Sequence, residues 1–220
     1  KEDYHTDAYK KAEWRHTLSI RSCTNVKVYG LTLENSGGDG IYLGVSKRGV
    51  TNKDIHIKDV VCDAHNRQGI SVISAENLLI EDTMLKNTSG TAPRAGIDFE
   101  PNHPSEKIAN CVMRNCVSEN NEGSAYVFYL KPMDGTSTPV SARIENCVSR
   151  GTNSISAAVI TSNGGPKGPV MGLIEFVDCR FEDTGTAGIS IRDVPVDGCR
   201  VRFTNCTVAD GSPGSWTGTI

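Results

Sequence analysis

The sequence is poor in aromatic residues, in long apolar runs and in net charge. Aromatic side chains make up 6% of the 220 residues, whereas Gly occurs 22 times, a balance that favours a turn-rich β protein over a helical bundle. No apolar run approaches the roughly 18 residues of a membrane span. The net charge of −3 leaves no basic excess for nucleic acid. We therefore expect one domain, with neither a membrane nor nucleic acid as its partner.

Cysteine is present, but never as a CxxC pair. The closest two of the eight cysteines, Cys111 and Cys116, are five residues apart, so zinc ligation is poorly supported. Disulfides are possible, but the regular spacing of most of the cysteines indicates a structural repeat.

One element recurs seven times along the chain. Each copy has Asn, Asp or Gly at its fifth position, and the sixth positions lie 23 to 33 residues apart by subtraction of their residue numbers. Loops of varying length therefore separate a constant core. The seven copies are VKVYGLTLENS (26–36), IHIKDVVCDAH (55–65), LLIEDTMLKNT (78–88), CVMRNCVSENN (111–121), ARIENCVSRGT (142–152), IEFVDCRFEDT (174–184) and VRFTNCTVADG (201–211).

A second short strand follows each of the first six copies and begins at a small residue. These strands are GIYLG (40–44), GISVI (69–73), GIDFE (96–100), AYVFY (125–129), SAAVI (156–160) and GISIR (188–192). Two strands per turn, a fixed bend and a period near 30 residues are typical of a parallel β-helix. We predict an all-β solenoid of about seven coils, a single domain over residues 1–220. Residues 1–16 form a polar segment, residues 17–211 the coils and residues 212–220 a tail.

Stacked coils place like residues in ladders. In the last four copies the sixth column reads Cys116, Cys147, Cys179 and Cys206. Because cysteine is among the most buried residue types, we read this column as free, stacked thiols, with disulfides as the alternative. The asparagines that precede three of these cysteines are expected to hydrogen-bond the backbone of the bend.

Polar and aromatic side chains gather on the outer face of the second strand in the first four coils. Side chains alternate along a strand, so one row faces the core and the next faces outward. Four coils spaced about 4.8 Å apart span on the order of 15 Å, enough for two or three sugar units. The outer-face residues are Asp39, Tyr42, Arg67, Gln68, Ser71, Arg94, Asp98, Glu100, His103, Tyr129 and Lys131. The later coils place Ala158 and Ile160 there, so the first half is expected to carry the function.

The carboxylates of Asp98 and Glu100 are the candidate catalytic pair. They could be the acid and the nucleophile or base of a glycoside hydrolase. Alternatively they could hold Ca²⁺ that neutralises a uronate, while Arg67 or Arg94 removes the proton α to its carboxylate. Surface ion pairs of the arginines with Asp98 or Asp39 are the alternative without catalysis.

The other side chains of this face are predicted to contact the substrate. Arg67 and Arg94 suit bidentate binding of a sugar carboxylate or sulfate. Aromatic rings suit stacking on sugars. The predicted binding residues are Asp39, Tyr42, Gln68, Ser71, His103, Tyr129 and Lys131.

The stretches GDGIYLG, RQGISVISAENLLIED and AGIDFEPN resemble right-handed, single-stranded parallel β-helix proteins of the pectate-lyase-like superfamily. The resemblance extends over about residues 16–210. It implies a polysaccharide or oligosaccharide partner along the outer face of one sheet, and a secreted or periplasmic location. The chain lacks the GDD and GHG stretches of polygalacturonases and the DPHE-like stretch of mannuronan epimerases. No catalytic role is therefore carried over from those families.

The first residues, KEDYHTDAYKKAEWRH, are polar where this superfamily usually places a capping helix. This stretch looks like an insertion within a longer β-helix, and no signal peptide precedes it. We expect a fragment whose open strand edges meet a missing β-helix segment or an oligomer partner.

Three functions are compatible with these residues. The favoured one is a lyase or related uronate-processing enzyme acting on an anionic polysaccharide. The first alternative is a glycoside hydrolase that uses Asp98 and Glu100. The second alternative, from another class, is a non-catalytic carbohydrate-binding or structural β-helix module.

Overall fold

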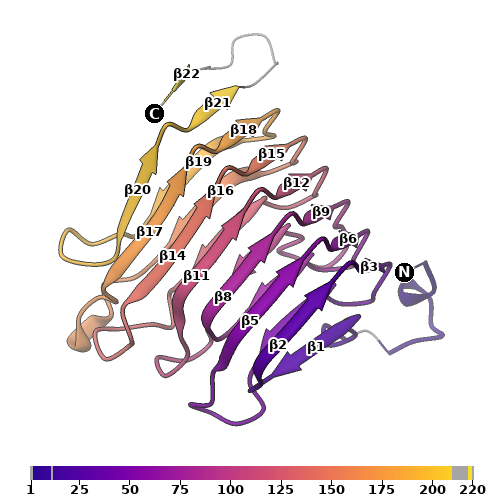
Figure 1. Cartoon of the computed structure of the whole chain (residues 1–220), viewed down its shortest axis with the longest axis horizontal. Helices are drawn as coiled ribbons and strands as arrows, with labels where there is room; N and C mark the ends of the chain where they lie inside the picture. The colour runs from indigo at the N-terminus through magenta and orange to yellow at the C-terminus, as the bar shows by residue number, and fades with distance from the viewer. Residues whose placement is uncertain (1, 11, 210–217, 220) are drawn as a thin grey trace.

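The strands stack in parallel from turn to turn (Figure 1). In this computed structural model, which describes residues 2–10, 12–209 and 218–219, they form a β-solenoid of about six turns with three sheets. The parallel coil predicted from the repeats is confirmed. The prediction of about seven coils agrees with the seven strands that sheets A and B each contain.

Each sheet takes one strand from every turn. Sheet A contains β1 (Leu18–Arg21), β4 (Ile41–Gly44), β7 (Ile70–Val72), β10 (Ile97–Phe99), β13 (Tyr126–Tyr129), β16 (Ile155–Ile160) and β19 (Ala187–Arg192). Sheet B contains β2 (Thr24–Tyr29), β5 (Asn52–Lys58), β8 (Ala75–Glu81), β11 (Ile108–Arg114), β14 (Val140–Glu145), β17 (Gly172–Val177) and β20 (Arg200–Thr204). Sheet C contains β3 (Thr32–Glu34), β6 (Val61–Asp63), β9 (Met84–Lys86), β12 (Val117–Glu119), β15 (Val148–Arg150), β18 (Arg180–Glu182), β21 (Thr207–Ala209) and the antiparallel β22 (Gly218–Thr219).

Every turn thus has three strands, whereas the sequence predicted two. The repeated element bends at its fifth residue, which separates a strand of sheet B from a strand of sheet C. At this bend all seven residues, among them Asn115 and Asn146, have φ between 48° and 64°. This left-handed conformation favours Gly, Asn and Asp, which explains the composition of the column.

The sequence predicted that the bend asparagines bond the backbone of the bend. Two of them, Asn115 and Asn146, instead bond side chains of the neighbouring turns. Asn146 Nδ2 donates to Asn115 Oδ1 at 2.8 Å, and Asn115 Nδ2 reaches Asp82 Oδ1 at 3.4 Å. The stacking of turns places these side chains above one another, so the amides form a ladder along the solenoid.

The core follows the alternation predicted for the second strand. Ile41, Ile70, Ile97 and Tyr126 are in register across β4, β7, β10 and β13 and are fully buried. The eight cysteines are free thiols, as predicted, and all except the partly exposed Cys23 are buried. The inward row opens at the last turn, where Ile191 is 46% exposed although it was predicted to face the core.

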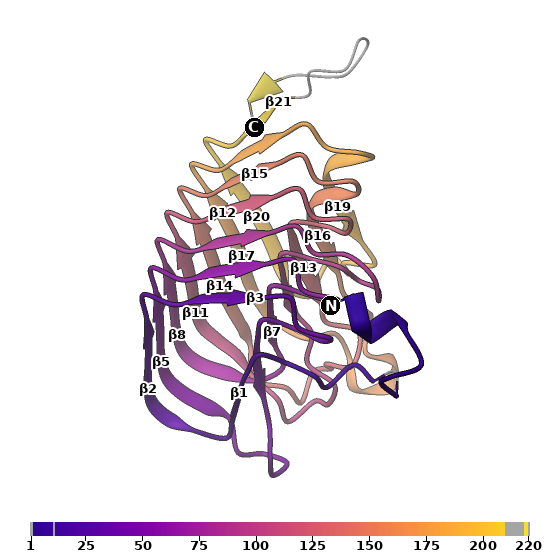
Figure 2. The same ribbon diagram turned by 90° about the vertical axis from the view of Figure 1, so that its right-hand side faces the viewer.

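The N-terminal segment folds back beside the first turns on the side of sheet A (Figure 2). It begins with the 3₁₀ helix η1 (Glu2–His5); a second 3₁₀ helix, η2 (Gly165–Lys167), lies between β16 and β17. A Cβ at Gly37 would lie 2.6 Å from Tyr4 Cδ2, and one at Gly38 would lie 2.5 Å from the Glu13 carbonyl oxygen. The two glycines therefore form the seat of the segment.

Neither 3₁₀ helix, nor any other part of the chain that the structure describes, has the length and apolar character of a membrane-spanning helix. Most of the predicted tail, residues 212–217 and 220, lies outside the described residues.

Candidate functional site

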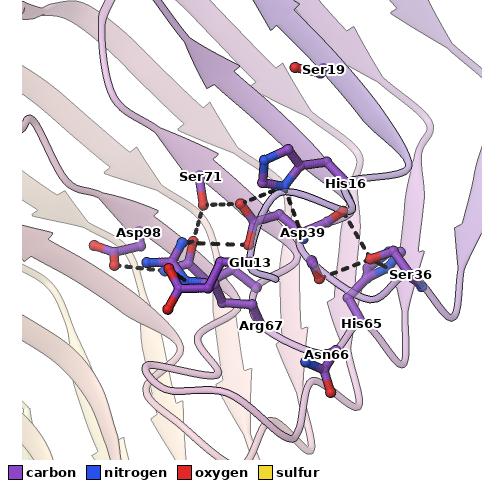
Figure 3. A network of polar contacts seen from close by, with 12 residues as sticks. Glu13, His16, Ser19, Ser36, Asp39, His65, Asn66, Arg67, Ser71 and Asp98 are labelled. Carbon is purple, nitrogen blue, oxygen red and sulfur yellow. Dashed lines mark hydrogen bonds and ion pairs between the residues drawn. The ribbon is translucent and has the colours of Figure 1, made fainter. Parts of the chain in front are cut away.

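Polar side chains from the first four turns meet on the outer face of sheet A, with Arg67 at their centre (Figure 3). Arg67 Nη2 donates to Glu100 Oε2 at 3.1 Å, and Nη1 lies 3.6 Å from Asp39 Oδ1. From the N-terminal segment, Glu13 Oε2 lies 3.7 Å from Arg67 Nε. One guanidinium therefore holds three carboxylates that come from distant parts of the sequence.

These contacts change the part that Arg67 can play. Burial by itself would lower the pKa of Arg67, but the carboxylates of Asp39, Glu100 and Glu13 outweigh it and raise the pKa. A guanidinium held in this way stays charged and cannot remove a proton from substrate. The ion pair of Arg67 with Asp39, one of the alternatives drawn from the sequence, is present.

The outer row of sheet A is buried at this point rather than solvated. Asp39, Gln68 and Ser71 have no exposed surface, and Asp98 is 2% exposed. Arg67 contacts Gln68, Asp39 and Glu100 and so bridges the side chains of this row. Asp98 is therefore not a solvated surface carboxylate.

Asp98 is held by a single donor. Gln68 Nε2 donates to Asp98 Oδ2 at 2.8 Å, while the buried Oδ1 has no hydrogen-bond partner. Burial raises the pKa of Asp98 well above its usual range, and Glu100 and Asp39 raise it further, against the opposing effects of Arg67 and Gln68. Asp98 is therefore suited to carry a proton under conditions in which ordinary carboxyl groups have lost theirs.

A cavity of about 320 Å³ opens on the N-terminal side of Arg67. The ring of Tyr42 stacks on His16 with centroids 4.3 Å apart, and Arg21 lies over Tyr42 at 4.9 Å. Burial raises the pKa of Tyr42, an effect that Arg21 opposes. Trp14, 68% exposed, adds a large aromatic surface to the lining of the cavity.

A second cavity, of about 460 Å³, opens on the C-terminal side and shares Arg67 and Glu100 with the first. Asp98 lines it, and Tyr129 and Arg192 lie further along. The later turns contribute an apolar floor that includes Val127, Ile155 and Ala158. Because they share two lining residues, the two cavities form one groove along sheet A. The N-terminal half of the groove is mainly polar, and the C-terminal half has an apolar floor.

Three predicted residues lie apart from the central cluster. Arg94 is ion-paired with Glu122 at 2.9 Å and lines neither cavity. His103 contacts its own loop through Ser105, with Nδ1 and Oγ 2.9 Å apart. Lys131 pairs with Asp193 at 3.2 Å beside a separate cavity beyond β13. The structure thus does not group Arg94 and His103 with Asp98.

The described residues offer no group of three or more His, Cys, Asp or Glu side chains that could hold a metal ion. The predicted Ca²⁺ site at Asp98 and Glu100 therefore remains without a defined set of ligands.

The N-terminal segment supplies three lining residues that the sequence did not point to, Glu13, Trp14 and His16. The segment does not repeat, so it has no register with the ladders, and sequence spacing could not place it. The double glycine at 37–38, which seats the segment, was the available signal.

The fold defines the chain as a parallel β-solenoid with a polar groove on one sheet. It is 31% identical over 98 residues to the uncharacterized protein YclG of Bacillus subtilis (strain 168), a match that covers 40% of this chain and 16% of that protein. The chain thus corresponds to a small part of that relative. No family model and no solved structure matches the chain.

Proposed function

We propose that this β-solenoid is a polysaccharide-active enzyme whose reacting groups are the carboxyls of Asp98 and Glu100. The observation that carries the proposal is the state of Asp98, a buried acid with one oxygen held by Gln68 and the other, Oδ1, without a partner beside the cavity. Two residues away, Glu100 is ion-paired with Arg67. One carboxyl is thus placed to donate a proton and the other to accept one.

Hydrolysis of a glycosidic bond uses both groups directly. Asp98 would protonate the leaving oxygen, and Glu100 would take a proton from the attacking water. Outward positions i and i+2 of a strand lie roughly 6.5–7 Å apart. The separation of the two carboxyl groups themselves decides between retention and inversion at the anomeric carbon.

Elimination from a uronate is the second candidate, and Arg192 favours it. Its guanidinium lines the same cavity as Asp98 and Glu100 and could bind a sugar carboxylate. Glu100 would remove the α-proton, the bond to the leaving oxygen would break as the double bond forms, and Asp98 would protonate that oxygen. Arg67 would hold Glu100 in place instead of acting as the base predicted from the sequence.

The resemblance to the pectate-lyase-like superfamily supports a carbohydrate ligand for the groove. In this proposal, a polysaccharide or oligosaccharide lies across the stacked turns and meets Trp14, Tyr42 and Tyr129. A secreted or periplasmic location belongs to the same proposal, because that is where such polymers occur.

A panel of neutral and anionic polysaccharides tests the proposal. Ultraviolet absorbance of an unsaturated sugar and release of reducing ends are followed together, for the wild type, Asp98→Asn and Glu100→Gln. Reducing ends without absorbance indicate hydrolysis, and both signals together indicate elimination. Either signal should fall at least about 100-fold in both variants.

The matched control is Glu119→Gln, which removes a carboxylate ion-paired with Arg150 on sheet C, and it should keep full activity. If Asp98→Asn retains the wild-type rate, the assignment of the acid is wrong. Sugar binding without either product in the wild type would instead favour the non-catalytic module.

A further inference from the structure

A chain of polar contacts crosses the outer face of sheet A from His16 to Asp98 (Figure 3). His16 Nδ1 lies 3.2 Å from Asp39 Oδ2, and Ser71 Oγ lies 2.8 Å from that same oxygen. Ser71 Oγ also contacts Gln68 Oε1. Gln68 Nε2 then donates to Asp98 Oδ2 at 2.8 Å. The chain is continuous and buried from one cavity to the other.

Arg67 decides the orientation of the Gln68 amide. Its Nη1 lies 3.2 Å from Gln68 Oε1, and a guanidinium can only donate. The atom facing Arg67 is therefore the amide oxygen, and the NH₂ group faces Asp98. Because Asp98 Oδ2 accepts this bond, the proton of a neutral Asp98 sits on Oδ1, the oxygen without a hydrogen-bond partner.

Ser71 has one hydroxyl hydrogen but contacts two oxygens that can accept it. When Asp39 is ionised, its carboxylate attracts that hydrogen. When Asp39 itself carries a proton on Oδ2, it donates to Ser71, and the serine hydrogen turns to Gln68 Oε1. The direction of one hydroxyl therefore follows the protonation state of the pair.

Ionisable groups face this chain from every surrounding element. They are Glu13 and His16 from the N-terminal segment, Arg21 from β1, Tyr42 from β4, His65 and Arg67 before β7, Glu100 after β10 and Glu106 before β11. His16 and Asp39 form the end of the chain that is remote from Asp98. Arg67 also contacts Asp39, but its guanidinium stays charged, so Ser71 senses the protonation of Asp39 and His16.

We infer that Ser71 and Gln68 are positioning residues that couple the protonation of the His16–Asp39 pair to Asp98 and keep the acidic hydrogen of Asp98 on Oδ1. No proton has to travel along the chain, since rotation of one hydroxyl is sufficient. The catalytic meaning of this coupling rests on the proposed function; the coupling itself does not.

A ¹³C-carboxyl NMR titration of Asp98 tests the coupling without any substrate. Removing the hydroxyl in Ser71→Ala should move the titration midpoint of Asp98 by about one pH unit. Asp39→Asn should move it as well. The conservative Ser71→Thr, which keeps a hydroxyl, should restore the wild-type midpoint. Ser190→Ala is the matched control, because Ser190 stands in the same outward row in the last turn and touches none of these groups.

The inference would be overturned if Ser71→Ala, shown by its unfolding transition to be folded, kept the wild-type titration midpoint of Asp98. If the proposed reaction is found, the pH at half-maximal kcat should shift in Ser71→Ala by a similar amount, while KM changes little. A merely structural serine would lower stability and leave that pH unchanged. A shifted NMR midpoint in a protein without activity would refute the proposed function and leave the coupling standing.

Discussion

Asp98 combines burial with a single hydrogen-bond donor, which makes its ionisation costly in the folded state. Its pKa is raised by burial and then by Glu100 and Asp39, from an ordinary value of 3.8. A carboxyl whose folded pKa is raised stabilises the fold below its unfolded pKa, and that contribution is lost as pH rises through the folded pKa. Wild-type stability should therefore decline above about pH 4 through this group.

Replacing Asp98 by Asn removes this dependence on pH. Relative to wild type, Asp98→Asn should gain on the order of 1–2 kcal/mol in the free energy of unfolding between acidic and mildly alkaline pH. Urea unfolding at a series of pH values measures the difference. The control Asp193→Asn, at an exposed carboxylate, should show little change with pH. A flat difference for Asp98→Asn would mean that the pKa of Asp98 is the same in the folded and unfolded states.

Trp14 offers the largest exposed aromatic surface at the groove. If a sugar stacks on it, Trp14→Ala should weaken oligosaccharide binding about tenfold, equivalent to about 1.4 kcal/mol. Calorimetry measures the loss of affinity. In Trp216→Phe, where Trp14 is the remaining tryptophan, fluorescence reports ligand binding at Trp14 directly. Equal affinities of Trp14→Ala and its background protein would remove Trp14 from the binding site.

Residue by residue, the sequence located the centre of the site better than its edges. Asp39, Gln68, Ser71 and Asp98 stand at fixed places in the repeat, so stacking of the turns brings them together. Arg94 stands in the insertion before β10, where a left-handed φ of 59° accompanies its pairing with Glu122 rather than with the cluster. Register predicts contacts only for residues that belong to the ladders.

At the scale of the element, the left-handed bend separates sheets B and C in every turn. Asn115→Gly should keep the conformation and lose the amide contacts, whereas Asn115→Ala should in addition pay about 1–2 kcal/mol for a left-handed φ of 55°. The difference in the free energy of unfolding between Asn115→Gly and Asn115→Ala, from thermal or urea unfolding, measures the cost of the left-handed conformation. Asn153→Ala, away from the bend column, is the control. Equal stabilities of the two Asn115 variants would contradict this reading.

The thiol ladder is the second device of the element. Only thiolates that a reagent can reach react readily. Burial raises the pKa of Cys111, which lies outside the ladder, to about 12. Within the ladder, the hydrogen bond with Cys179 lowers the pKa of Cys206 to about 6, but Cys206 has no exposed surface. In the folded protein we therefore expect about one thiol, Cys23, to react quickly with a thiol reagent, and the other seven only after unfolding. Titration before and after denaturation counts them. Cys23→Ser should abolish the fast phase; its persistence would show that a buried cysteine becomes accessible.

The repeated element was recognised from its Asn and Asp column, but its division into two strands was not. In IHIKDVVCDAH the alternation breaks at Asp59, but a bulge within one strand breaks the alternation as well as a turn between two strands does. Only the backbone conformation of Asp59, with φ of 52°, turns the chain into the next sheet. The Asn and Asp column of the repeated element predicts a bend, but it does not predict the angle through which the chain turns.

Over the whole molecule, the outer face of the seven stacked strands of sheet A extends about 29 Å from the first strand to the last. If a sugar chain lies along that face, affinity should rise with oligosaccharide length up to about five units and then level off. Calorimetry with a length series measures this. Arg192→Ala, in the last strand of sheet A, should weaken the longer ligands more than the shorter ones. Equal losses at all lengths would place the ligand parallel to the strands instead.

The loop between β9 and β10 is longer than its counterparts, yet β10 pairs in register with both β7 and β13. Extra residues there left the neighbouring turns undisturbed. Each turn can consequently acquire or lose a loop without any compensating change elsewhere. The wall of the groove can then diversify one segment at a time, so related chains could share this scaffold and the buried chain from His16 to Asp98 while accepting polymers of different shape.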